Sequence, residues 1–405
     1  MNLPYFIAKR ISDPKQGNFS STIQKVAVAS VAIGLAVMIG AYMILGGFQN
    51  TITDKIFSFS GHIQITKFSF SNSVEEDPIK LEQEGMQAII KNSHVSHIQE
   101  YAHKPVLLSK DDEVYGIVVK GVAESFNLDF FEKYLVEGRF INFNDSVFSP
   151  EILISKEVAE DMILKVGDKV VAHIIQDPPR VRQLTVVGIY NTELDDFDKK
   201  IILGDIKMIR GLNGWEAGQV GGYEVFVNDF SKLEEANNEL ADLVDIDQTT
   251  DMVPEKFVQI FEWLALLNQN NYIFLALILF VACFNIVSVL FILIMERTQM
   301  IGMFKAIGAT DSLIRKVFSY NGIRLVFKGA ILGNIIAISF GAIQYYFKPI
   351  SLDPVHYYMA YVPIDWDWTV ILGLNAMVIA LIAITIFLPT ALISRVRPVQ
   401  AIRFD

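Results

Sequence analysis

Cysteine and charged residues are both scarce in this chain of 405 residues. Cys283 is the only cysteine, which excludes a fold built on disulfide bridges. Charged residues make up 20% and hydrophobic residues 52%, and this much apolar surface excludes a disordered chain. The net charge of −11 excludes a general nucleic-acid binder, which needs a basic face. What the sequence has instead is a set of long apolar runs.

The charges are unevenly divided along the chain. Residues 49–270 contain 20 Lys and Arg against 38 Asp and Glu, a balance of −18. The remaining residues contain 14 and 7, a balance of +7. An acidic block between basic and apolar ends predicts a membrane protein with one large soluble part.

Four apolar segments are long enough to cross a hydrocarbon core of about 30 Å, which takes roughly 20 helical residues. They are residues 26–48, 271–295, 318–347 and 368–394. No A-x-A site follows the first segment, which favours an uncleaved anchor over a signal peptide. Arg324 and Lys328 make the start of the third segment basic, and we attribute them to snorkelling toward anionic headgroups.

Lysine and arginine in the short segments outside the spans set the orientation. Segments 1–25, 296–317 and 395–405 are rich in them, whereas segment 348–367 has only Lys348. We therefore expect both termini and segment 296–317 to be cytoplasmic, with residues 49–270 on the opposite side.

Residues 49–270 have the pattern of a mixed α+β domain. Period-2 alternation and β-branched residues predict strands at 62–68, 114–122, 151–155, 169–175, 182–189 and 223–227. Ser231 and Glu234 fit a capping box that starts a helix whose buried face holds Leu233, Ala236, Leu240 and Val244. Apolar residues at helical spacing from 257 to 267 predict a stalk helix running into the second span.

Asp177, Pro178, Pro179 and Arg180 interrupt two predicted strands, so we expect an exposed hairpin or loop tip. It is either an ordinary turn or a docking point for a partner.

Motifs that carry chemistry are missing. The sequence has no G-x4-G-K-[ST] phosphate loop, no G-x-S-x-G elbow, no H-E-x-x-H helix and no C-x-x-C pair. His94, His97 and His103 lie close together on a polar stretch without partner cysteines, which favours solvated surface histidines over a metal site. We therefore expect neither catalysis nor a bound cofactor or metal in this chain.

The most specific stretch follows the second span. Residues 296–310, ERTQMIGMFKAIGAT, fit a short amphipathic helix that starts at Glu296 and Arg297 and stops at Gly308. Its small residues Gly302, Ala306 and Ala309 would let another protein approach closely.

This stretch resembles the coupling segment of FtsX-like, MacB-type permeases of ABC transporters, and residues 389–405 (PTALISRVRPVQAIRFD) resemble the ending of that family. The layout of one span, a large outer domain and three further spans is similar too. Residues 6–11 (FIAKRI) and 47–65 (GFQNTITDKIFSFSGHIQI) resemble the N-terminal signature of the lipoprotein-releasing, LolC/LolE-type branch. Shorter matches are EGRF, ILISK, VGDKV and FVACFNIVS at 137–140, 152–156, 166–170 and 280–288.

The resemblance implies a permease subunit in the bacterial inner membrane whose outer domain, MacB-like and periplasmic, lies between the first two of four transmembrane helices. A separate ATPase of the LolD type would bind ATP and Mg²⁺ and dock on the loop. A second permease copy or a paralogue would complete the pair, and a lipoprotein would pass from the membrane lipids to a LolA-like carrier. The coupling residues would be Glu296, Arg297, Ile301, Gly302, Phe304, Lys305, Ala306, Gly308 and Ala309.

Two further sets of residues have open roles. In LolC-type permeases a longer protruding hook grips the carrier, whereas the matching region here is short. If this short region also binds a carrier, the docking residues would be Asp177, Pro178, Pro179 and Arg180. Phe48, Asn285 and Ser288 would either pack helices or line a substrate cavity. The alternatives to lipoprotein extraction are a MacB-like exporter of small molecules or peptides, an FtsX-like regulator of a cell-wall hydrolase, and an inert membrane-anchored sensor.

Overall fold

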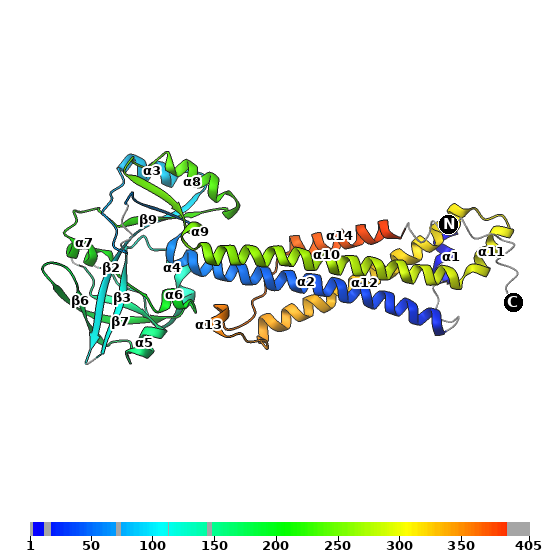
Figure 1. Cartoon of the computed structure of the whole chain (residues 1–405), viewed down its shortest axis with the longest axis horizontal. Coiled ribbons are helices and arrows are strands. Elements are labelled where there is room, and N and C mark those ends of the chain that lie inside the picture. Colours follow the sequence, from blue (N-terminus) through cyan, green and yellow to red (C-terminus); the bar gives the residue numbers. More distant parts are fainter. Residues whose placement is uncertain (1–2, 12–17, 70–73, 112, 144–147, 387–405) are drawn as a thin grey trace. The chain divides into compact units, whose positions relative to one another are not determined.

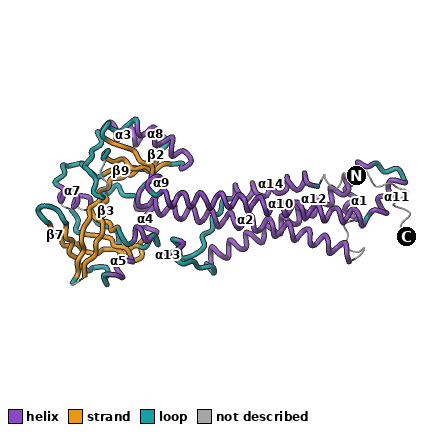
Figure 2. The backbone as a smooth tube through the Cα atoms, viewed as in Figure 1, coloured by secondary structure: helices purple, strands orange, loops and turns teal. Residues whose placement is uncertain are grey.

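The computed structural model describes residues 3–11, 18–69, 74–111, 113–143 and 148–386. It divides into two compact units, the first made of residues 1–50, 263–351 and 362–405 and the second of residues 51–262 and 352–361. In the described ranges, strands occur only in the second unit (Figure 2). The expected tail 395–405 and the family-like ending 389–405 lie outside the described residues.

The first unit is helical (Figure 1). Its helices are α1 (Leu3–Ile11), α2 (Asn18–Ser60), α10 (Val258–Glu296), α11 (Thr298–Ala306), α12 (Asp311–Phe347) and α14 (Trp368–Thr385). Four of them, α2, α10, α12 and α14, are long and apolar enough to cross a membrane, which confirms the four predicted transmembrane helices. At 1.5 Å per residue, α2 and α10 are about 65 and 58 Å long, roughly twice what a hydrocarbon core needs.

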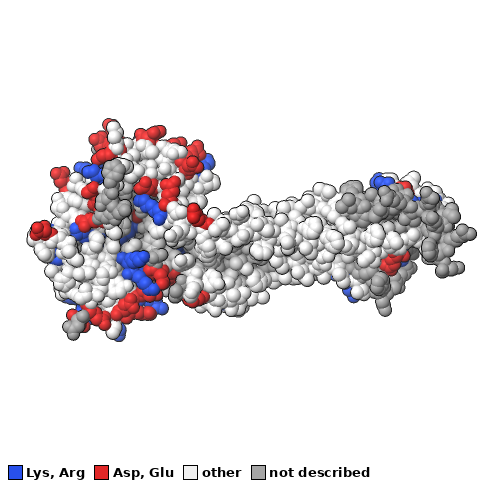
Figure 3. Space-filling model, in the orientation of Figure 1, with Lys and Arg blue, Asp and Glu red and all other residues white. Residues whose placement is uncertain are grey.

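Glycines bring the backbones of α2 and α12 together. A Cβ on Gly329 would lie 2.7 Å from Cβ of Val31, and one on Gly333 would lie 2.8 Å from the carbonyl oxygen of Ala32. Without an apolar driving force in lipid, such close packing is what holds transmembrane helices together. The visible face of the helical unit is uncharged along most of its length, whereas many acidic and basic residues are scattered over the visible face of the second unit (Figure 3).

The second unit contains ten strands among its described residues. They are β1 (Ile63–Lys67), β2 (Val95–Lys110), β3 (Glu113–Val122), β4 (Leu135–Gly138), β5 (Glu151–Ser155), β6 (Lys169–Ile174), β7 (Arg180–Tyr190), β8 (Ile201–Asp205), β9 (Gly222–Val227) and β10 (Gln248–Met252). Its short helices are α3 (Gln83–Lys91), α4 (Leu128–Phe131), α5 (Lys156–Asp161), α6 (Asp195–Asp198), α7 (Ile206–Asn213), α8 (Leu233–Ala241), α9 (Val253–Lys256) and α13 (Pro354–Tyr357). This confirms the predicted mixed α+β domain.

The pairing of the strands closes a barrel. β2 pairs with β3, β3 with β8, β8 with β5, β5 with β7, β7 with β6, and β6 again with β2. The first half of β2 instead pairs with β9, and β9 pairs with β1 and β1 with β10, in a smaller antiparallel sheet. The strand β2 is therefore shared by the barrel and the small sheet.

Alternating apolar side chains fill the barrel, as the period-2 pattern predicts. Val170, Ala172 and Ile174 of β6 are buried, whereas the residues between them are exposed or half-buried. The small sheet is covered by α3 and α8, where the amide of Asn92 at the end of α3 donates to Glu239 of α8 (Figure 1). Leu233, Ala236 and Leu240 form the buried face of α8, as expected.

Two details of the α+β prediction are wrong. The helix α8 starts at Leu233. Asp229 is the N-cap of the 3-10 helix Phe230–Lys232 just before it and accepts a hydrogen bond from the backbone N–H of Ser231, whereas Ser231 caps no helix. Of the three histidines expected on a polar stretch, His94 lies in the turn just before β2, while His97 and His103 lie within β2; all three are half-buried. His103 binds Glu76 and the ring of His97 lies 2.7 Å from the carbonyl oxygen of Ser125, so these two are not solvated surface histidines.

Candidate functional site

The helix α11 packs one apolar face against its neighbours. Ile301 is fully buried and forms a small core with Ile294 of α10 and with Ile314 and Phe318 of α12. Phe304 packs against the edge of this core. The spacing that predicted an amphipathic helix therefore identified the residues that hold α11 in place.

The other face of α11 is apolar and exposed. Met303 and Ile307 are 63% and 76% exposed, and Ala306 between them is exposed as well. Gly302 is buried, so a partner would not meet it, contrary to our expectation from the sequence. Of the expected small residues Ala306 is exposed and Ala309 is half-buried. The exposed surface consists of Met303, Ala306 and Ile307, a set we call the α11 face.

The helix α11 begins and ends close to the positions that the sequence predicts. Glu296 is the last residue of α10 and Arg297 is the N-cap position of α11, so the helix starts two residues later than the charged pair predicts. Gly308 has a φ of +93°, a conformation that suits glycine, and this turn leads to α12. Lys305 forms an ion pair with Asp311 at 2.9 Å, and this pair links the end of α11 to the first turn of α12. Ala309, which lies in the turn between the two helices, is half-buried.

The loop between β6 and β7 is a hairpin loop, as expected. Asp177, Pro178 and Pro179 are exposed, while Arg180 starts β7 and donates to the carbonyl oxygen of Gly211 at 3.0 Å. Ile175, which the sequence analysis did not single out, is 78% exposed at the base of the loop.

This loop borders the larger of two cavities that we describe, about 1020 Å³ in volume. The cavity is lined by the hairpin loop, by the end of α7 and by β1, β2 and β10. Lys104 lies in its wall, where its ammonium group binds Glu75 at 2.5 Å and Asn213 at 2.6 Å. His103 binds Glu76 there, and although burial alone would raise the pKa of Glu76, this contact lowers it. The side chains of Lys104 and His103 in this polar wall are therefore already bound to neighbouring carboxylates.

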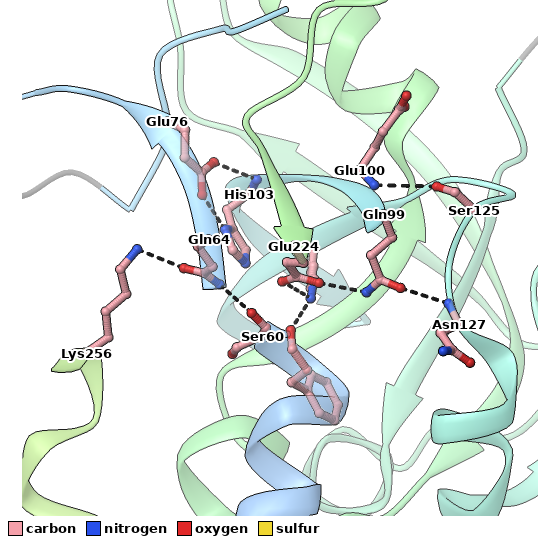
Figure 4. Close-up of polar contacts among 12 residues, drawn as sticks. Ser60, Gln64, Glu76, Gln99, Glu100, His103, Ser125, Asn127, Glu224 and Lys256 are labelled. Atoms are coloured by element: carbon pink, nitrogen blue, oxygen red, sulfur yellow. Dashed lines mark hydrogen bonds and ion pairs between the residues drawn. The ribbon is translucent and has the colours of Figure 1, made fainter. Parts of the chain in front are cut away.

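The last turn of α2 is joined to the strands by a buried ion pair (Figure 4). Lys120 of β3 and Glu224 of β9 are 1% and 0% exposed, and their charged groups are 2.6 Å apart. Lys120 also donates to the carbonyl oxygen of Phe59 in the last turn of α2. A cation there satisfies a carbonyl group that the helix leaves unpaired.

Side-chain amides extend this contact in two directions (Figure 4). Gln99 donates to Glu224 at 2.8 Å and accepts from the backbone N–H of Asn127. Gln64 donates to the carbonyl oxygen of Ser60 at the end of α2 and accepts from Lys256 of α9. The end of α2 therefore accepts from both Lys120 and Gln64, and Gln64 also accepts from Lys256 of α9, the short helix just before α10. We call these two neighbouring sets of polar contacts the helix junction.

Aromatic rings surround the helix junction within the second unit. Phe59 packs against Phe131, Tyr190 and Phe197, with centroids 5.2 to 5.6 Å apart. Phe57 packs against Phe261 in the first turn of α10 at 5.8 Å. Such pairs add stabilisation to the area they bury, so the two helix ends are held by a packed apolar cluster as well as by hydrogen bonds.

His62 follows this cluster and is neutral at pH 7. Burial lowers its pKa to about 4. The uncharged ring lets Nδ1 accept from the backbone N–H of Val227 at 3.1 Å. This contact fixes the turn from α2 into β1 against β9.

Within the apolar helices the residues expected from sequence have local roles. Phe48 is buried against Trp263, 5.4 Å between centroids, and Ser288 donates to the carbonyl oxygen of Phe284 one turn back in its own helix. Asn285 is half-buried. Polar contacts between helices are made instead by Gln49 of α2, which donates to the carbonyl oxygen of Leu264 in α10, and by Asn334 of α12 and Asn375 of α14, whose amides donate to each other at 2.7 and 2.9 Å. Two asparagines 41 positions apart carry no local sequence signal.

Four long apolar helices, with an α+β unit between the first two, define a multi-pass membrane protein with a large extramembrane domain. Two family models match the chain: a MacB-like periplasmic core domain over residues 26–243 and an FtsX-like permease C-terminal region over residues 272–398. The chain belongs to the FtsX-like, MacB-type permeases of ABC transporters. A permease is the non-catalytic, transmembrane subunit, which implies an ATPase partner, and the topology is consistent with the bacterial inner membrane.

Relatives match over the full length of the chain. It is 22% identical to the lipoprotein-releasing system transmembrane protein LolE of Haemophilus influenzae, with 99% of each chain covered. It is also 22% identical to the transmembrane protein LolC of the same system in Neisseria meningitidis, with 96% of each covered. Among solved structures, the periplasmic region of MacB from Actinobacillus actinomycetemcomitans is 13% identical with a TM-score of 0.36, covering 50% of this chain and 92% of that one.

Proposed function

We propose that this chain is the permease subunit of a transporter that extracts lipoproteins from the bacterial inner membrane and passes them to a periplasmic carrier. The observation that carries this proposal is the full-length match to two relatives that are both named as lipoprotein-releasing proteins. The match includes the span, the α+β domain and the three further spans in the same order. Both termini are cytoplasmic in this proposal, the α+β unit is periplasmic, and a second copy or a paralogue completes the permease pair.

The ATPase subunit docks on the α11 face in this proposal. Met303 and Ile307 are the exposed apolar residues there, and exposed apolar groups on a short helix at the end of a span are suited to burial by a partner. Glu296 at the end of α10 is exposed as well, and Ile301, Phe304 and Lys305 hold α11 against α10 and α12. A displacement of α11 would then displace α10 and α12 as well.

The helix junction receives the motion at the other end of α2 and α10. Each helix is continuous over about 40 residues, and a continuous helix transmits displacement along its axis better than a loop. The ion pair of Lys120 and Glu224, with the aromatic cluster, then moves the strands together with the helix ends. Nucleotide-driven closure of the ATPase would in this way reach the periplasmic unit.

The lipid chains of the substrate set the energy requirement. Each methylene that leaves the bilayer costs about 0.8 kcal/mol, so two acyl chains cost far more than thermal motion supplies. The carrier and the ATPase together offset this cost. The carrier docks on the hairpin loop in this proposal, through the exposed Ile175 and the neighbouring Pro178 and Pro179.

The test is depletion of this protein followed by separation of inner and outer membranes. Newly made lipoproteins accumulate in the inner membrane if the proposal is right, and they sort normally if the cargo is a small molecule or if the chain controls a hydrolase. Ile307→Asp should reproduce the defect and abolish co-purification of the ATPase. Ser312→Asp, at another exposed position just inside α12, is the matched control and should do neither.

A separate test addresses the carrier. Photo-crosslinkers placed at Ile175 and at Asp177 should capture the soluble carrier, and the double variant Pro178→Gly with Pro179→Gly should reduce that capture. Unchanged capture in the double variant would remove the prolines from the docking site, and no capture at either position would remove the loop.

A further inference from the structure

A groove in the first unit lies between α1 and α12. It has a volume of about 400 Å³, within the usual range for small-ligand sites. Tyr5 and Ala8 of α1 form one wall. The other wall is α12, which contributes Tyr320, Asn321, Ile323, Arg324, Phe327 and Lys328.

Two cations stand on the exposed face of α12 at this groove. Arg324 and Lys328 are one helical turn apart, so their side chains project from the same face. Among the residues that the structure describes, neither one forms an ion pair with a carboxylate, whereas Lys305 nearby in sequence is paired with Asp311. Their charges are available to an anionic ligand.

Apart from Asn321, the rest of the groove is lined by aliphatic and aromatic residues. Ile323 and Phe327 flank the two cations and are both exposed, and Tyr5 and Tyr320 meet edge to face with centroids 6.0 Å apart. The contact of the two tyrosines holds α1 against α12 and closes part of the groove. A ligand that fills this space therefore needs an anionic end and an apolar body.

The position along α12 places the two cations at headgroup depth. The apolar stretch that follows, residues 329–347, has 19 residues and is about 28 Å long, which matches the hydrocarbon core of a bilayer. Arg324 and Lys328 precede that stretch by one to five residues. Their charged groups thus lie where the phosphates of a membrane lie, and the apolar side chains beside them lie where acyl chains begin.

We propose that the groove between α1 and α12 binds an anionic phospholipid. The headgroup phosphate lies between Arg324 and Lys328, and the start of an acyl chain lies along Phe327 and Tyr5. Zwitterionic lipids fit the apolar part equally well, but their amine opposes the two cations, so the site selects for net negative charge. The lipid bridges α1 and α12 and so stabilises the position of the N-terminal helix.

The experiment is native mass spectrometry of the full chain in detergent, titrated separately with phosphatidylglycerol, phosphatidylethanolamine and inorganic phosphate. Phosphatidylglycerol should bind at lower concentration than phosphatidylethanolamine. The double variant Arg324→Gln with Lys328→Gln should weaken phosphatidylglycerol binding by about fivefold for each cation, roughly 25-fold in all, and leave phosphatidylethanolamine unchanged.

The matched control is Arg315→Gln with Lys316→Gln, which removes two exposed cations from the same helix outside the groove. It should leave phosphatidylglycerol binding unchanged; an equal loss there would show diffuse surface attraction and overturn the site. Arg324→Lys with Lys328→Arg keeps the charges and should keep the preference even if the glutamine variant is unstable. Equal binding of the two lipids by the unmodified chain, or displacement of the lipid by equimolar inorganic phosphate, would also overturn the proposal.

Discussion

The buried ion pair at the helix junction can be broken from either side. Replacing Lys120 by Met leaves the fully buried carboxylate of Glu224 with only the amide of Gln99, and it removes the donor from the carbonyl oxygen of Phe59. Replacing Glu224 by Leu leaves the buried ammonium group of Lys120 without a counter-charge. Removing one partner of a buried pair costs about 3–5 kcal/mol, so each single variant should destabilise the strands by that amount.

The double variant Lys120→Met with Glu224→Leu should cost clearly less than the two single changes added together. It leaves no unpaired charge, and the remaining penalty comes from the carbonyl group of Phe59 and the amide of Gln99, about 1–3 kcal/mol for each of these buried polar groups. The effects of the two mutations on the free energy of unfolding are therefore strongly non-additive in this prediction, because each buried charge is destabilising only when its partner is missing.

Amide hydrogen exchange of the full chain in detergent measures this locally. Peptides from β3 and β9 should lose protection in each single variant, and the loss in the double variant should be clearly smaller than the sum of the two single losses. Lys199→Met, which breaks the solvent-exposed pair with Asp195, is the control and should leave protection unchanged. Additive losses in the double variant, or unchanged protection in the single variants, would refute the idea that this pair holds the junction together.

Three other substitutions test packing and charge elsewhere. Burial raises the pKa of Asp198 to about 6, so the native state binds this proton more tightly than the unfolded chain does. The free energy of unfolding should therefore fall as the pH rises from about 4 to about 6, by about 3 kcal/mol in all. Asp198→Asn should abolish this pH dependence in thermal unfolding measured between pH 4 and 7. Gly47→Ala would place a Cβ less than 3 Å from backbone atoms and should lower the thermal stability by about 1–3 kcal/mol, whereas Gly40→Ala meets no atom within 4 Å and should not. Asn334→Leu should cost about 1 kcal/mol of helix packing in detergent denaturation, with little further loss when Asn375→Leu is added.

The membrane spans and most strands were predictable because their signals are local. A run of apolar residues needs about 20 positions to identify a span, and alternation needs about five to identify a strand. The β5 strand was predicted with its observed bounds, and β6 and β9 within one residue.

The helix junction was not predictable, since its polar residues resemble surface residues in sequence. Gln99, Lys120 and Glu224 are buried only because each finds its partner on another strand, and Lys120 and Glu224 are 104 positions apart. The same feature hid β2, whose first half is polar and was interpreted as a solvated stretch. Burial of a polar group depends on its long-range partner, which one sequence does not display.

For α11 the helix was predictable but its orientation was not. Periodicity places Ile301 and Phe304 on one face, and it does not say whether that face meets the chain itself or another protein. The structure buries Ile301 and Gly302 within the chain and exposes Met303 and Ile307.

The strand β1 has consequences for the order in which the chain is made. Both of its neighbours, β9 and β10, lie far downstream, and Ile63 pairs with Val225 and with Met252. At a synthesis rate of about 5–20 residues per second, β1 waits on the order of 10–40 s for its last partner. During that time its hydrogen-bonding groups are open to other chains, and long-range pairing of this kind folds slowly. The small sheet is complete only after Met252 has been made, immediately before the ribosome reaches α9 and the second span.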